Sequence, residues 1–168
     1  MLDKKLLIEL QEYVEMYTTT LSCIVLESEM YAEQDICEYL PNVELNDFIN
    51  SNRKPSFNNV LFSFIDNKGL SDSAIYKKAG IDRRHFSKIR SNPKYRLSKN
   101  TAIALCLALE LNKEDTDKLL SSAGYSLSNS DTFDLIIQFC VDKKIYDIYD
   151  VNHALDYFSL KPLIGVLA

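Results

Sequence analysis

Apolar residues recur at helical spacing through most of the chain. Between residues 57 and 65 they fall at positions i, i+3, i+4, i+7 and i+8, which places them on one face of an amphipathic helix. Gly69 follows, and glycine tolerates the left-handed conformation common at the C-terminus of a helix. The pattern therefore predicts a helix that begins near residue 57 and ends before Gly69.

Two short helices with a tight turn between them are predicted next. The first starts after Ser71, a good N-cap residue, and stops at Gly80. The second covers residues 82–91, begins with an aspartate that suits an N-cap, and turns Phe86 and Ile89 inward. A helix, a glycine-containing turn and a second helix with a polar outer face are typical of a helix-turn-helix unit.

Two more helices complete this predicted bundle. Ser98 suits the N-cap of the segment TAIALCLALEL, which is apolar nearly all round and should therefore be central. Asn112 and Asp115 resemble a capping box at the start of a further helix, which ends at Gly124. We expect this last helix to close over the core.

The flanking segments are also helical in pattern. Residues 2–17 form an amphipathic repeat, whereas the following TTTLSCIVL suits either a strand or a further helix. Two amphipathic helices are predicted beyond the bundle, one starting at Ser130–Asp131 and one near Asp147. They suit either docking onto the bundle or a dimer interface. With only four glycines and four prolines, an all-β sandwich is disfavoured, and we predict an all-α chain.

Charge divides the chain unevenly. Residues 1–52 hold eleven acidic and two basic residues, a net charge of −9, whereas residues 53–112 hold four and twelve, a net of +8. The remaining residues, 113–168, carry a net of −4. Nine lysines and arginines fall between residues 77 and 99, with Asp82 as the one acid among them. Such a cluster is typical of a phosphate-binding surface, although a merely solvated face has the same composition.

Composition shifts give the expected domain division. Residues 1–52 form an acidic, partly helical extension, residues 53–125 the helix-turn-helix domain, and residues 126–168 a C-terminal helical pair. The acidic extension suits three interpretations that the sequence leaves open. It folds back on the basic helix, recruits a protein partner, or simply packs and solubilises the chain.

Several classes of protein are disfavoured. The four cysteines and two histidines lack the paired spacing of a zinc site, so we expect no metal and no cofactor, and we expect Cys106 and Cys140 to be buried. No P-loop, G-x-S-x-G, H-E-x-x-H or glycine-rich nucleotide turn is present, so we expect no enzyme. The longest uncharged stretches are little more than half the roughly 20 residues of a membrane span. We expect a cytoplasmic protein without a membrane partner.

At residues 57–124 the chain resembles the Cro/repressor-type (XRE-like) helix-turn-helix domain, a five-helix DNA-binding bundle. The resemblance rests on GLSDSAIYKKAGIDRRHFSKIRSN, LSKNTAIALCLALELN and KEDTDKLL. It implies that the helix after the turn enters the major groove of double-stranded DNA. The side chains expected to meet base edges are Arg83, Arg84, Ser87 and Lys88. Those expected to meet phosphates are Lys77, Arg90, Lys94, Arg96 and Lys99.

Two positions depart from the pattern of that family. Asp72 stands where members often carry a glutamine that reaches a phosphate, and an anion there would be repelled. Tyr76 stands where members usually carry alanine, so its ring must widen the helix crossing or point outward. Both departures favour a protein-binding use of the same scaffold.

The sequence thus predicts a DNA-binding transcriptional regulator of repressor type. The alternative is a protein-interaction adaptor, antitoxin or inhibitor that acts through the acidic arm, residues 1–52. Since helix-turn-helix proteins commonly bind two DNA half-sites as dimers, a homodimer is a further expectation. His85, between the inner and outer faces of its helix, suits either a phosphate contact or packing.

Overall fold

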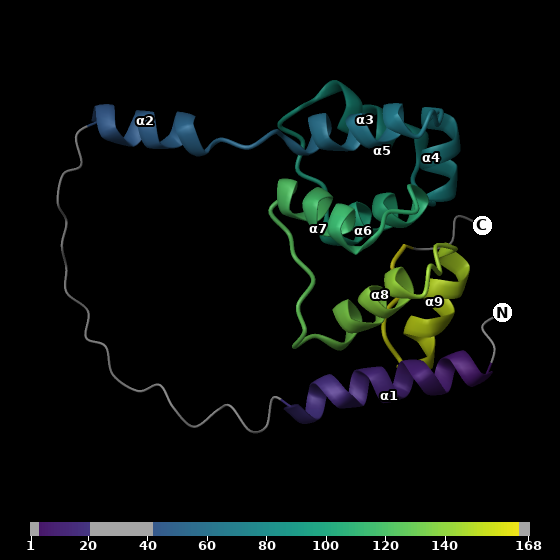
Figure 1. Ribbon diagram of the computed structural model, residues 1–168. Helices are drawn as coiled ribbons and strands as arrows, with labels where there is room; N and C mark the ends of the chain where they lie inside the picture. The colour runs from purple at the N-terminus through teal and green to yellow at the C-terminus, as the bar shows by residue number, and fades with distance from the viewer. Residues whose placement is uncertain (1–3, 21–41, 165–168) are drawn as a thin grey trace, which may run out of the picture.

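A computed structural model describes residues 4–20 and 42–164, and all the regular secondary structure in these two ranges is helical (Figure 1). The helices are α1 (Lys4–Thr20), α2 (Asn42–Asn52), α3 (Phe57–Asn67), α4 (Asp72–Lys78), α5 (Arg83–Ser91), α6 (Lys99–Ala108), α7 (Lys113–Ser122), α8 (Thr132–Asp142) and α9 (Ile148–Tyr157). The predicted all-α class is confirmed.

The predicted helix boundaries follow from local hydrogen bonds. Five residues expected at helix starts accept a hydrogen bond from a backbone amide of the first turn: Ser71, Asp82, Ser98, Asn112 and Asp147. Each bond satisfies an amide that lacks a partner within its helix. Asp131 precedes α8 without such a side-chain bond. The helix expected over residues 82–91 accordingly begins at Arg83, with Asp82 outside it as the cap.

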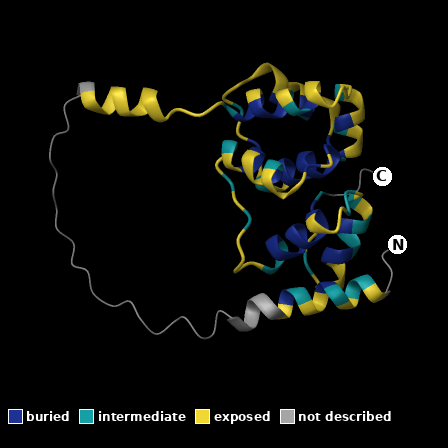
Figure 2. Cartoon of the chain, viewed as in Figure 1, coloured by how far each residue is buried: buried dark blue, intermediate teal, exposed yellow. Residues whose placement is uncertain are grey.

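Helices α3 to α7 pack as one group around α6. Every residue from Thr101 to Leu109 is buried, as expected for a segment that is apolar nearly all round. α4 and α7 pack against α6, and α3 packs against α7. In Figure 2 the buried faces of these helices turn toward one another and their exposed faces turn outward.

Helices α8, α9 and α1 form a second group (Figure 1). The buried Leu10 and Val14 of α1 lie in the common core, and the Tyr13 ring lies 5.4 Å from the Phe139 ring of α8. Tyr157 of α9 donates a hydrogen bond to Gln11. The start of the acidic extension therefore packs on the C-terminal helices. Residues 21–41, which include the most acidic part of the extension and most of TTTLSCIVL, lie outside the described residues.

Helix α2 is a feature that the sequence interpretation missed. The expected extension, residues 1–52, was described only as partly helical, and α2 occupies its last eleven residues. Leu45, Phe48 and Ile49 lie at i, i+3 and i+4, so the helical signal was present. Their side chains are exposed, Phe48 by 67%. α2 stands apart from both helical groups in Figure 1.

Candidate nucleic-acid interface

The turn between α4 and α5 positions the candidate site. Gly80 adopts a φ of +62°, a left-handed conformation that glycine reaches without steric cost. The amide of Ile81 then donates to the carbonyl of Tyr76 at 2.9 Å, which closes the end of α4. Asp82 accepts a hydrogen bond from the amide of Arg84 at 2.7 Å and so starts α5 immediately after the turn. The two short helices are thereby joined by only four residues, 79–82, which limits their relative movement.

One face of α5 is anchored in the core. Phe86 and Ile89 are buried, and Phe86 lies between the rings of Phe62 and Tyr76, with centroids 6.3 and 6.1 Å away. The buried Asn58 of α3 donates a hydrogen bond to the carbonyl of Ile89. These contacts fix both the depth and the rotation of α5, because turning the helix would bury charge and break the Asn58 bond.

The opposite face of α5 carries the predicted base-reading residues. Arg83, Arg84, Ser87 and Lys88 are all exposed. The side chains of the three cations make no hydrogen bond or ion pair within the described parts of the chain. Arg83 and Ser87 also line a hollow of about 430 Å³ between α4 and α5. Arg83, Arg84, Ser87 and Lys88 thus form a basic surface that runs from the first to the last turn of α5, which we call the α5 basic face.

The five side chains predicted to contact phosphates fall into two groups in the structure. Lys77, Lys94 and Arg96 are exposed, and none of the three side chains pairs with an acid among the described residues. Lys94 and Arg96 lie in the loop between α5 and α6, which is pinned where Tyr125 donates to the carbonyl of Leu97 at 2.8 Å. These three cations remain available for an external anion.

The other two phosphate candidates already have acidic partners. Arg90 forms an ion pair with Asp72, and its guanidinium carbon lies 4.8 Å from the centre of the Phe62 ring. Lys99 forms an ion pair with the buried Asp134 of α8. Sequence reasoning missed both pairs because their partners lie 18 and 35 residues apart, where no spacing rule applies.

The structure also accommodates Asp72 and Tyr76, the two residues that depart from the family pattern. The carboxylate of Asp72 is paired with Arg90, so the charge expected to repel a phosphate is compensated. Tyr76 is half-buried and packs against Phe86, so its ring is accommodated at the helix crossing. His85 packs against Tyr95, and its Nε2 is buried without a hydrogen-bond partner, which accords with the packing role.

A third ion pair braces the end of α4. Lys78 pairs with Glu110, whose carbonyl also accepts a hydrogen bond from Lys68 at 3.3 Å. The bond and charge of Lys78 hold the pKa of Glu110 below its ordinary value. Glu110 has a φ of +49°, in the left-handed region. Lys78 therefore serves the fold, whereas the neighbouring Lys77 is left for other contacts.

The remaining chemistry of the described residues is sparse. No group of three or more histidine, cysteine, aspartate or glutamate side chains in residues 4–20 and 42–164 is arranged to hold a metal ion. Among the described helices, none is long and apolar enough to cross a bilayer.

No protein-family model, no curated protein and no solved structure matches this chain. The site must therefore be interpreted from its own geometry and charge.

Proposed function

We propose that the protein binds double-stranded DNA and regulates transcription, with α5 in the major groove. The observation that supports this most strongly is the α5 basic face. Arg83 and Arg84 are the first two residues of the second helix of a helix-turn-helix pair, and such residues usually contact base edges. A guanidinium offers two parallel donors, which match the O6 and N7 acceptors of guanine.

The phosphate contacts in this proposal come from cations that the fold does not use. Lys77, Lys94 and Arg96 are exposed and without acidic partners among the described residues. Arg90 keeps donors beyond the one paired with Asp72, and its side chain is 56% exposed, so it remains a weaker candidate. We assign Lys99 to the fold, because Asp134 already uses its charge.

The proposal is tested by fluorescence anisotropy on the full chain with a random duplex, between about 50 and 200 mM salt. Duplex selection then yields a preferred sequence. Arg84→Ala should lose about 1–3 kcal/mol of discrimination for that sequence. Lys94→Ala should weaken all duplexes alike and reduce the salt slope by about one.

Lys113→Ala is the matched control, since Lys113 is exposed at the start of α7. Binding indistinguishable from that of the control in both variants would contradict the proposed interface. Absence of any duplex binding at the lowest salt would contradict the function itself. Deleting residues 1–52 is an unsuitable test, because Leu10 and Val14 of α1 belong to the core.

The alternative function, a protein-interaction adaptor, antitoxin or inhibitor, has one observation in its favour. Helix α2 exposes Leu45, Phe48 and Ile49 on the same helix as Glu44 and Asp47. An exposed apolar stripe flanked by acids is typical of a protein-binding helix. If the chain binds no duplex, α2 becomes the first surface to mutate, and Phe48→Ala should then weaken partner binding. The homodimer stays a prediction.

A further inference from the structure

Helix α2 carries an uncovered apolar face. Leu45, Phe48 and Ile49 are exposed by 44%, 67% and 41%, and their spacing puts them on one side of the helix. Figure 2 shows α2 exposed along its described length and apart from both helical groups. Adjacent apolar side chains in water are typical of a surface that binds another protein chain. The other large exposed apolar side chains among the described residues lie on other elements: Ile8, Leu70, Tyr149 and Tyr157.

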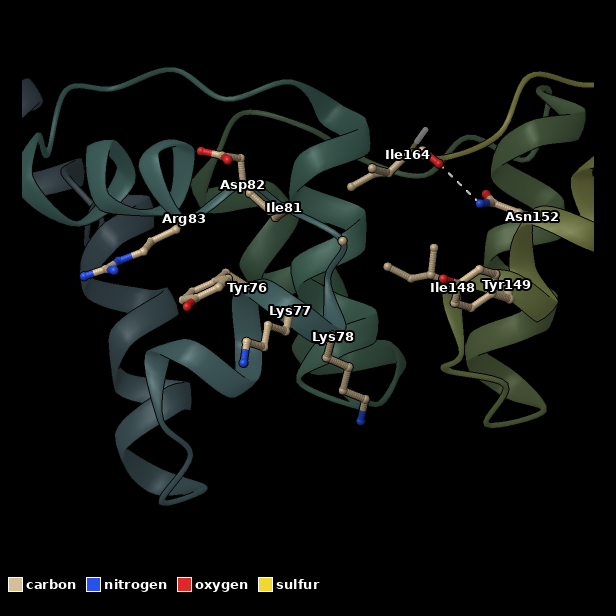
Figure 3. Close-up of a pocket in the computed structure, with 11 residues that line it drawn as sticks. Tyr76, Lys77, Lys78, Ile81, Asp82, Arg83, Ile148, Tyr149, Asn152 and Ile164 are labelled. Atoms are coloured by element: carbon tan, nitrogen blue, oxygen red, sulfur yellow. Dashed lines mark hydrogen bonds between the residues drawn. The ribbon is translucent and has the colours of Figure 1, made fainter. Parts of the chain in front are cut away.

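The C-terminal helices, which the sequence suggested as a dimer interface, have their apolar faces largely covered within the chain. Every residue of α8 from Asp134 to Val141 is buried, and α1 and α9 both pack on this helix. Ile148 and Ile164 are half-buried and point across a cleft toward the turn after α4 (Figure 3). These helices are therefore used mainly by the fold, whereas the apolar face of α2 is not.

Charge is distributed unevenly along α2. Glu44 and Asp47 lie in its N-terminal half, and Arg53 and Lys54 directly follow its last residue, Asn52. All four charged side chains are exposed, and none forms an ion pair among the residues that the structure describes. Two copies of α2 in parallel would place acids against acids and bases against bases. An antiparallel pair would place the acidic end of each copy beside the basic end of the other.

We propose that α2 pairs with α2 of a second copy of this chain, in antiparallel orientation. The pair is centred between Phe48 and Ile49, so that each phenylalanine packs on the isoleucine of the other copy. Glu44 lies four residues before Phe48, and Arg53 lies four residues after Ile49. The same register therefore brings each Glu44 opposite the Arg53 of the other copy.

The position of the connection to α3 also suits an antiparallel pair. Each α2 is about 16 Å long, and residues 53–56 leave it at its C-terminal end. In an antiparallel pair these ends point in opposite directions, so the two helical bundles lie at opposite ends and do not collide. The presence of both Glu44 and Arg53 in one chain favours a second copy over an unrelated partner, which would need only one of the two charges.

The proposed interface is small. With three apolar side chains and one ion-paired arginine from each copy, it belongs to the weak class that buries less than about 1,200 Å². We expect a dissociation constant of about 10–100 µM. The inference does not depend on DNA binding, because α2 and Arg53 belong neither to the α5 basic face nor to the proposed phosphate contacts.

Sedimentation velocity on the full chain, from about 1 to 300 µM, measures the equilibrium between monomer and dimer. Phe48→Ala should weaken the dimer about tenfold or more, because Phe48 is the largest apolar side chain at the centre of the pair. Ile8→Ala, at an exposed apolar residue of α1, is the matched control and should leave the dimer unchanged. Since α2 lies outside both helical groups, Phe48→Ala should unfold in urea like the wild type.

Reversal of charge tests the orientation of the pair. Glu44→Lys and Arg53→Glu should each weaken the dimer about tenfold, since each turns two attractive pairs into repulsive ones. The double variant restores opposite charges across the pair and should regain the affinity of the wild type. Glu12→Lys, at an exposed acid of α1, is the charge-matched control and should change nothing.

Three results would overturn the inference. A chain that stays monomeric at the highest concentration would exclude the dimer. Equal weakening by Phe48→Ala and Ile8→Ala would place the interface elsewhere than α2. A double reversal variant that stays as weak as the single ones would exclude the antiparallel pairing. Because no duplex is present in these measurements, their failure would leave the proposed DNA interface untouched.

Discussion

The Nζ atom of Lys99 lies 2.6 Å from Oδ2 of Asp134, and this pair joins α6 of the first helical group to α8 of the second. The same carboxylate oxygen accepts the amide of Ser128 at 2.7 Å. The Asp134 side chain is 1% exposed, whereas that of Lys99 is 30% exposed. A buried carboxylate needs this compensation, because an unpaired charge inside a protein is strongly unfavourable.

Removing the Lys99 charge should therefore destabilise the fold. We expect Lys99→Met to lower the free energy of unfolding by about 2–3 kcal/mol, somewhat less than for a fully buried pair because water reaches the ammonium group. Lys94→Met, at an exposed lysine without an acidic partner among the described residues, should stay within about 0.5 kcal/mol. Urea unfolding measures both. Equal stability of the two variants would show that Asp134 does not depend on Lys99.

The Lys99–Asp134 pair also illustrates which features of the structure the sequence could predict and which it could not. The starts of α4, α5, α6 and α7 follow from local chemistry, because a capping side chain bonds within three residues of itself. Gly69, Gly80 and Gly124 all have a positive φ, so the ends of three helices could be predicted for the same reason. Interactions confined to a few residues leave a readable spacing in the sequence.

Long-range pairs leave no such spacing. Nothing near Lys99 in the sequence distinguishes it from Lys94, yet only Lys99 lies beside a buried acid in α8. Likewise, the sequence left three roles open for residues 1–52, namely contact with the basic helix, recruitment of a partner or simple packing, and the structure shows that the apolar face of α1 packs on α8. Charge indicated the exposed α5 basic face but could not show which cations the fold itself uses.

The turn glycine provides a second prediction. Gly80 and Gly69 have φ values of +62° and +61°, so an alanine at either position is strained by the same backbone conformation. A Cβ at Gly80 would lie 3.8 Å from Cγ2 of Ile164, an ordinary contact, and one at Gly69 would meet nothing within 4 Å. Each alanine should therefore cost about 1 kcal/mol of unfolding free energy. A cost at Gly80 more than twice that at Gly69, measured by urea unfolding, would mean that Ile164 cannot tolerate the contact.

The pH dependence of stability should include Glu110. Lys78 lowers the pKa of this carboxyl in the folded chain, so its stabilising contribution is present above the unfolded pKa near 4.5 and is lost as the pH falls through the lower folded value. Glu110→Gln should cost about 0.3–0.8 kcal/mol at neutral pH, because the pair is exposed and screened. The cost should vanish in strong acid. A difference from wild type that does not shrink on acidification, followed by urea unfolding across pH, would contradict this role.

The two buried cysteines should react with thiol reagents only after the protein unfolds. Burial raises the pKa of the Cys140 thiol to about 12 and raises that of Cys106 further, so neither forms appreciable thiolate near neutral pH. Both are free and buried. Iodoacetamide followed by peptide mass spectrometry should leave both unmodified in the native protein and modify both in urea. Rapid labelling of Cys140 without denaturant would mean that α8 opens readily.

The packing of α1 gives the last prediction, and it separates a structural role from an autoinhibitory one. Leu10 is 1% exposed within the core shared with α8, so Leu10→Ala should lower the free energy of unfolding by about 2–4 kcal/mol. Ile8 is 56% exposed on the same helix, and Ile8→Ala is the matched control, with an expected effect within about 0.5 kcal/mol. An arm that merely covered the α5 basic face would leave stability unchanged in both variants and raise duplex binding in at least one. Loss of stability in Leu10→Ala alone, with Ile8→Ala binding duplex like wild type, would instead identify α1 as part of the C-terminal fold.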